Sequence, residues 1–161
     1  LSKMPKLLQP TFNTVLILET VYPNHYNWIK QVSKTIIKID TPKLYNSQDS
    51  TPLIDGSYYL VVHSGGIDDV LQLCKEVAKI MKTTTIPIYV FTQVAVTITD
   101  SRFIVKSNLH PVSQYFKHAK HIFTGAGFNL INELQPYKKK HTVFAFNKLY
   151  DDQLFRKQQR T

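Results

Sequence analysis

The chain is poor in the residues that mark extracellular and membrane-spanning proteins. It has a single cysteine, Cys74, among 161 residues. It therefore cannot form an internal disulfide, and we expect a cytoplasmic protein. No apolar run approaches the roughly 18 residues needed to cross a bilayer. The N-terminus, Leu1-Ser2-Lys3, lacks an initiator methionine and the apolar core of a signal peptide, which indicates an excised or processed piece.

Acidic residues are also scarce: 11 stand against 20 lysines and arginines, for a formal net charge of +9. Such a balance favours an anionic partner, which could be nucleotide phosphates, an anionic membrane surface or nucleic acid. We expect no nucleic-acid partner, because the lysines are scattered and no aromatic–basic motif or recognition helix is present. The alternative is that many of these lysines only solvate the surface.

The apolar content is sufficient for a folded core, at 43% of the residues with nine Phe and nine Tyr. Near the N-terminus, residues 14–18 and 35–39 have the β-branched, apolar character of buried strands, and residues 25–34 between them can form a short helix. Residues 40–55 are polar and contain two prolines, which predicts a linker.

The remainder of the chain alternates between strand and helix patterns. We expect strands at residues 57–63, 86–91, 102–106, 121–124 and 142–146, and helices at 67–82, 112–119, after residue 127 and from residue 151. The helix at 67–82 has a regular apolar stripe. This alternation predicts an α/β fold, namely a Rossmann-like parallel sheet with helices on both faces. In such sheets ligands bind at the carboxyl ends of the strands.

Three turns are predicted at those strand ends: Ser64-Gly65-Gly66, Gly125-Ala126-Gly127 and the turn before Asp151. Glycine lets the backbone approach a phosphate closely, and a following helix N-terminus offers unpaired N–H groups. The turns match neither the GxGxxG fingerprint nor a P-loop. A tight strand–helix turn also needs glycine for steric reasons alone. His118 and His121 lack further ligands, so we expect neither a metal site nor a resident cofactor.

The segment HPVSQYFKHAKHIFTGAGFNLINEL, followed by YDDQ, resembles bacterial GT-B glycosyltransferases of the type that adds N-acetylglucosamine to the peptidoglycan lipid precursor. The resemblance covers roughly residues 57–160. It implies that Gly127 and Phe128 face the donor diphosphate, that Glu133 binds the ribose hydroxyls, and that Asp152 and Gln153 contact the transferred sugar. The first glycine turn resembles the family's loop over the diphosphate. The implied substrate-binding set is Ser64, Gly65, Gly66, Gly125, Ala126, Gly127, Phe128, Asn129, Glu133, Asp152 and Gln153.

The resemblance also implies a domain organisation. Residues 1–50 would be the end of a preceding acceptor domain and a linker, and residues 51–161 the nucleotide-sugar-binding domain, the C-terminal half of a GT-B fold. The donor would be a UDP-hexose or UDP-N-acetylhexosamine, and the acceptor lipid-linked or of another kind. A missing acceptor domain or subunit would supply the catalytic base, which is unknown, so this chain alone should bind a nucleoside diphosphate without transferring sugar.

Two other functions remain open. The chain could be a non-catalytic nucleotide-sugar-binding subunit or module that acts only with a partner, or a plain α/β interaction domain whose glycines are only turns. Lys138-Lys139-Lys140 would place the protein near an anionic membrane or a phosphorylated acceptor, peripheral to the inner face of the membrane. The competing interpretation of these lysines is a solvated loop.

Overall fold

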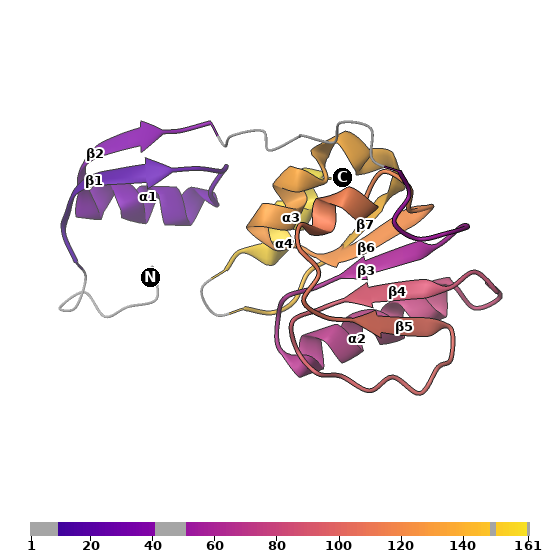
Figure 1. The fold of residues 1–161 in the computed structure, drawn as a ribbon. Helices are drawn as coiled ribbons and strands as arrows, with labels where there is room; N and C mark the ends of the chain where they lie inside the picture. The colour runs from indigo at the N-terminus through magenta and orange to yellow at the C-terminus, as the bar shows by residue number, and fades with distance from the viewer. Residues whose placement is uncertain (1–9, 41–50, 149–150, 161) are drawn as a thin grey trace.

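The computed structural model describes residues 10–40, 51–148 and 151–160, which form a two-stranded and a five-stranded sheet (Figure 1). Most of the expected linker, residues 41–50, lies outside the described residues. The assignment of residues 1–50 to the end of an acceptor domain remains a prediction.

The N-terminal unit consists of two parallel strands and one helix. β1 (Phe12–Ile17) pairs with β2 (Ser33–Lys38), and α1 (Pro23–Val32) connects them. Pro23 lies in the first turn of α1, a position that its fixed φ favours, so the helix begins two residues earlier than expected. β2 follows α1 without a loop. Buried Trp28, Ile29 and Val32 of α1 pack on Ile17 of β1.

The opposite face of this small sheet is apolar and exposed. Leu16 and Ile37 are register partners and are 56% and 46% exposed. Phe12, Leu18 and Ile39 are also exposed. Parallel sheets are normally covered on both faces, because their strands are apolar on both sides. We call these five residues the apolar sheet face.

The second sheet has five parallel strands in the order β5-β4-β3-β6-β7. Their bounds are β3 (Tyr59–Val62), β4 (Ile88–Phe91), β5 (Phe103–Lys106), β6 (His121–Gly125) and β7 (His141–Phe144). The strand order reverses between β3 and β6, and ligands bind beside such a reversal in open α/β sheets. The expected Rossmann-like parallel sheet is confirmed.

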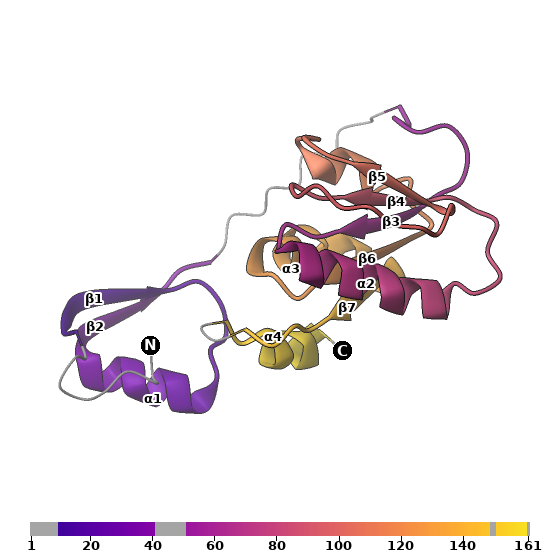
Figure 2. The ribbon, with the colours of Figure 1, turned by 90° about the horizontal axis from the view of Figure 1, so that it is seen from below.

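Helices cover both faces of this sheet, as predicted (Figure 2). On one face α2 (Ile67–Ile80) buries Val70, Leu73 and Val77 against Val61 and Val90. On the other face lie the 3-10 helix η2 (Val112–Tyr115) and the helix α3 (Phe128–Glu133). Their neighbours Phe116 and Leu134 pack there with Leu60, Val62 and Ile122.

Two segments differ from the expected elements. The helix expected at 112–119 is only the four-residue 3-10 turn η2. The lysine-rich segment is the 3-10 helix η3 (Gln135–Lys140), after which β7 begins at once. Both are short-range structures that apolar periodicity cannot distinguish from an α-helix or a loop.

The last helix, α4 (Gln153–Arg160), lies between the two sheets (Figure 2). At its end, buried Arg160 donates hydrogen bonds to the carbonyl oxygens of Ile131 and Leu134. At its start, Arg156 binds Glu19, which follows β1. Side chains of α4 therefore hold the N-terminal unit against the five-stranded sheet.

Candidate functional site

A cavity of about 490 Å³ opens at the carboxyl ends of the central strands. Its walls come from the segments that follow β3, β4 and β5 and from α3. Its polar lining includes His63, Ser64, Thr92, Gln93, Lys106, His110, Asn129 and Glu133. Because it lies where the strand order reverses, this is the expected position of a ligand in such a sheet.

Glu133 is the only carboxylate among the described residues that line this cavity. It is the last residue of α3 and is half-buried. Burial raises the pKa of Glu133 above its ordinary value. The structure therefore brings Ser64, Asn129 and Glu133, three of the residues predicted from the sequence, to one cavity.

His63, which the sequence analysis did not single out, forms part of the wall between the two glycine turns. It follows the central strand β3 and is only 7% exposed. A Cβ atom at Gly65 would lie 2.4 Å from His63 Nε2, and one at Gly125 would lie 2.6 Å from Nδ1. The imidazole also contacts the ring of Phe146, at 4.9 Å between centroids. Gly65 and Gly125 are thus glycines because the His63 ring occupies the space of their side chains.

Gly66 and Gly127 differ from the other two glycines. Apart from the flanking residues, no atom of the described chain lies within 4 Å of a Cβ built at either position, and φ is −65° at Gly66 and −67° at Gly127. Any residue could adopt that backbone. Gly66 precedes α2 and Gly127 precedes α3, in both cases without a side-chain cap on the helix. These two turns therefore have open space beside their backbone.

An ion pair adjoins His63. Asp69, in the first turn of α2, pairs with Lys148 from the segment after β7, and the same Asp69 oxygen lies 3.5 Å from His63 Nε2. Burial would raise the pKa of Asp69, but Lys148 and His63 outweigh it and lower that pKa. Burial lowers the pKa of His63; Asp69 opposes this shift and Lys148 adds to it.

The remaining turn residues are engaged within the protein. Ala126 is fully buried, its N–H donates to the Phe144 carbonyl at 2.8 Å, and its carbonyl accepts a hydrogen bond from Arg156. Phe128 opens α3 and is partly exposed, and its carbonyl accepts a hydrogen bond from Asn132. The backbone polar groups of Ala126 are thus already paired.

The acidic turn lies apart from the 490 Å³ cavity. Asp152 has a side chain that is 58% exposed and lies 4.0 Å from His25 of α1. Gln153 is 6% exposed; its Oε1 accepts from the Phe146 N–H and its Nε2 donates to Asp151. Asp152 therefore lies beside α1, whereas Gln153 is the first residue of α4 and its amide fixes the turn. Their predicted role in binding the sugar remains a prediction.

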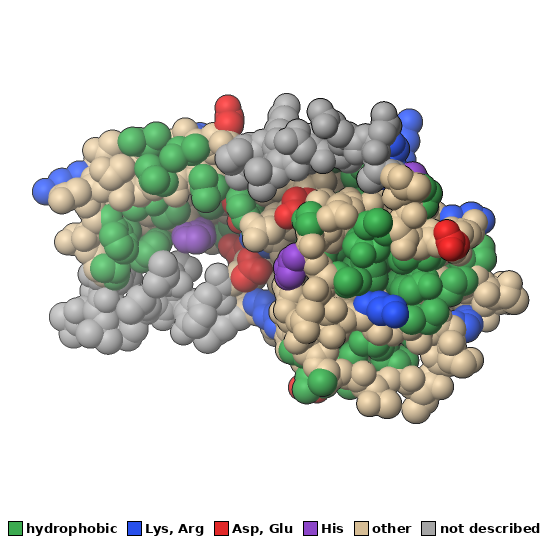
Figure 3. All heavy atoms as spheres, in the orientation of Figure 1, with side chains coloured by type: hydrophobic (Ala, Val, Ile, Leu, Met, Phe, Trp, Pro, Cys, Tyr) green, Lys and Arg blue, Asp and Glu red, His purple; other side chains and the backbone are tan. Residues whose placement is uncertain are grey.

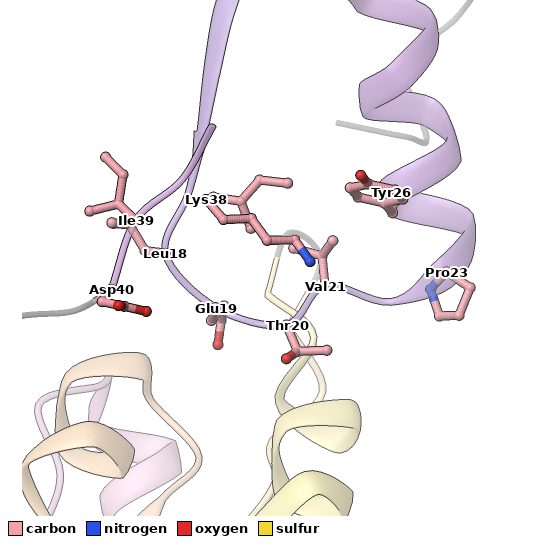
Figure 4. Close-up of a pocket in the computed structure, with 10 residues that line it drawn as sticks. Leu18, Glu19, Thr20, Val21, Pro23, Tyr26, Lys38, Ile39 and Asp40 are labelled. Carbon is pink, nitrogen blue, oxygen red and sulfur yellow. The ribbon is translucent and has the colours of Figure 1, made fainter. Parts of the chain in front are cut away.

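A second cavity, of about 570 Å³, lies at the carboxyl ends of β1 and β2. Figure 4 shows Lys38 extending into it and Tyr26 approaching from α1, while Glu19 and Thr20 lie on the side of α4. It is lined only by the N-terminal unit. Glu19 is bound to Arg156, and the described residues that line this cavity include no buried histidine and no glycine turn.

The three consecutive lysines are not equivalent. Lys140 donates hydrogen bonds to the carbonyl oxygens of Lys117 and Ala119, at 2.7 and 2.8 Å, whereas Lys138 and Lys139 are exposed. We predict that Lys140→Gln lowers the free energy of unfolding by about 1–2 kcal/mol, because it removes charged hydrogen bonds. Lys138→Gln with Lys139→Gln should change it by less than about 0.5 kcal/mol.

Urea denaturation measures both effects. The double variant also tests the membrane proposal without perturbing the fold. If Lys138 and Lys139 approach a membrane, this variant should co-sediment less with phosphatidylserine vesicles than the unchanged protein does. Equal co-sedimentation of the double variant and the unchanged protein would mean that these lysines only solvate the surface.

Comparisons with protein-family models, curated proteins and solved structures found no match to this chain. Within residues 10–40, 51–148 and 151–160, no helix has the length and apolarity to cross a membrane. In the same part of the chain, no three His, Cys, Asp or Glu side chains are grouped closely enough to hold a metal ion. The space-filling view shows apolar side chains gathered in patches on the N-terminal unit and over the five-stranded sheet (Figure 3).

Proposed function

We propose that residues 51–161 are the donor-binding domain of a glycosyltransferase, which binds a nucleotide-sugar, with UDP-hexose or UDP-N-acetylhexosamine as the expected donor. The observation that carries the proposal is the half-buried Glu133 in a 490 Å³ cavity at the strand-order reversal. A carboxylate there can accept hydrogen bonds from two adjacent ribose hydroxyls. The backbone at Gly66 and Gly127 has open space beside it, so that a diphosphate can approach the first N–H groups of the following helices.

The sugar would be transferred to a lipid-linked or other acceptor held by an acceptor domain or subunit. The apolar sheet face supports such a partner, because exposed Leu16 and Ile37 are side chains that a folded sheet ordinarily covers. The same observation suits the second candidate, a nucleotide-sugar-binding subunit without catalytic activity of its own. Both candidates share the donor site.

The two candidates differ in what this chain needs for turnover. A sugar-transfer assay distinguishes them. In this assay, the chain and a UDP-sugar are mixed with a separately produced acceptor domain or subunit. Transfer that appears only with Glu133 intact supports a catalytic donor domain. Binding of the UDP-sugar without transfer, whichever acceptor domain or subunit is added, supports the non-catalytic module.

Glu133 provides the sharpest test of donor binding. Glu133→Ala should weaken UDP binding by about 1.5–3 kcal/mol, the value of hydrogen bonds to a charged group. The loss should be smaller for 2′-deoxy-UDP, because one of the two hydroxyls is already absent. Isothermal titration calorimetry with UDP, 2′-deoxy-UDP and uridine measures these differences directly.

A matched control is Glu76→Ala on α2, since Glu76 pairs with Lys79 one turn away. It should leave all three affinities unchanged. Equal losses for UDP and 2′-deoxy-UDP in Glu133→Ala would show that Glu133 does not bind the ribose. Absence of UDP binding by the unchanged protein would reject the proposed function as a whole.

A further inference from the structure

The buried imidazole of His63 is a titratable group that packs against both glycine turns. At 3.5 Å from Asp69, its Nε2 has no hydrogen bond among the described residues. Asp69 is itself bound to Lys148. The cluster of His63, Asp69 and Lys148 therefore carries no net charge while His63 is neutral.

Each glycine turn contacts this ring through one of its glycines. Gly65 and Gly125 enclose it, and Gly66 and Gly127 follow them along the chain by one and two residues. Gly66 is also the uncapped start of the 14-residue helix α2, whose first N–H groups carry partial positive charge. An anion bound at the start of α2 would be one residue along the chain from Gly65, which contacts an imidazole that has little contact with water to screen its charge.

We propose that His63 takes up one proton when the diphosphate of a nucleotide-sugar binds beside Gly66 at the start of α2, and that the resulting imidazolium, stabilised by Asp69, is a binding charge of the donor site. The proposal rests on the proposed function and adds the group that neutralises the diphosphate. The proton comes from solvent, and no covalent bond forms or breaks.

The charged groups that face the His63 ring determine the direction in which its pKa shifts. Asp69 from α2 favours the charged imidazole, whereas Lys148 from the segment after β7 disfavours it. Gly65, Gly125 and Phe146, which also pack on the ring, carry no charge. The two negative charges of a bound diphosphate raise the pKa of His63. Affinity then increases as the pH falls through the interval between the bound-state and free-state pKa values.

A UDP-sugar is the appropriate probe, because both of its phosphates are diesters that stay ionised throughout this interval. We expect calorimetry in two buffers of different ionisation enthalpy to report uptake of about one proton per UDP-glucose bound at a pH within the interval. The association constant should rise by up to about tenfold per pH unit as the pH is lowered. Uridine, which has no phosphate, should bind without proton uptake.

His63→Gln should abolish the uptake and leave an affinity independent of pH. His110→Gln is the matched control, since His110 lines the same cavity but lies at its rim with Gln93; this variant should retain the uptake. Should His63→Gln fail to fold, the Cε1–H resonance of His63 in the unchanged protein supplies the same information. Its titration midpoint should move to higher pH when UDP-glucose is bound.

Binding of UDP-glucose without proton uptake, or with an unmoved His63 midpoint, would overturn the inference while leaving the proposed function intact. Undiminished uptake in folded His63→Gln would overturn it too. If the unchanged protein binds no UDP-glucose at all, the proposed function fails first and the inference with it.

Discussion

Replacing Gly125 with alanine is expected to lower the free energy of unfolding by about 2–3 kcal/mol, as overpacking of a buried site does. The added methyl group would lie 2.6 Å from His63 Nδ1 and 3.1 Å from the Phe146 ring. The imidazole cannot move aside, because Gly65 and Phe146 enclose it. Gly65→Ala should act similarly, with its methyl group 2.4 Å from His63 Nε2.

Gly127→Ala is the contrasting variant, from the same turn. Its methyl group enters open space at a φ that alanine adopts readily, so stability should change by less than about 1 kcal/mol, including the weaker capping by alanine. If the diphosphate approaches this backbone, UDP binding should weaken by about tenfold, which corresponds to ~1.4 kcal/mol.

Urea denaturation and calorimetry on the two variants separate these roles. A double variant, His63→Ala with Gly125→Ala, should recover part of the stability lost by Gly125→Ala, because the space is then free. Stability that is equally affected at Gly125 and Gly127 would contradict the assignment of one glycine to packing and the other to the ligand.

Arg156→Met is expected to lower the free energy of unfolding by about 2–4 kcal/mol, somewhat below the loss at a fully buried ion pair. The guanidinium is 10% exposed and binds both oxygens of Glu19, at 2.7 and 2.6 Å, as well as Asp151 at 2.8 Å. Its removal leaves two carboxylates close together without a cation. Arg156→Lys should rescue only part of the loss, because a lysine cannot bind a carboxylate through two parallel hydrogen bonds.

The loss should fall most heavily on the N-terminal unit, since Glu19 follows β1 whereas the five-stranded sheet has its own core. Hydrogen exchange should therefore show β1 and β2 losing protection in Arg156→Met while β3 and β6 keep theirs. Lys157→Met, on the exposed side of the same helix, is the control and should have no such effect. Uniform loss of protection would mean that the two units unfold as one.

The sequence was most informative where the structure depends on local periodicity. The apolar stripe at residues 67–82 predicted α2, which spans Ile67–Ile80, and the apolar runs predicted the strands of the parallel sheet. The ends of elements were less well predicted, as at α1 and η2. Those ends depend on capping, on proline and on the neighbouring segments.

The candidate site was predicted only in part. Glu133 and the two glycine turns were identified from spacing and resemblance. His63 was hidden as the last residue of an apolar strand, although a histidine directly before a glycine turn is a usable signal at a carboxyl strand end. Asp69 could equally be read as an ordinary first-turn acid of a helix.

The sequence by itself determined an α/β chain of parallel strands, because alternation and helical periodicity are short-range properties that each segment carries independently. Only the tertiary structure decided which glycines pack against His63 and which remain open, because that depends on the pairing of β3 with β6, far apart in sequence. It also decided that Lys148 reaches Asp69 and that Arg156 reaches Glu19, over 79 and 137 residues. Such contacts depend on how the chain closes in space, which local patterns do not specify.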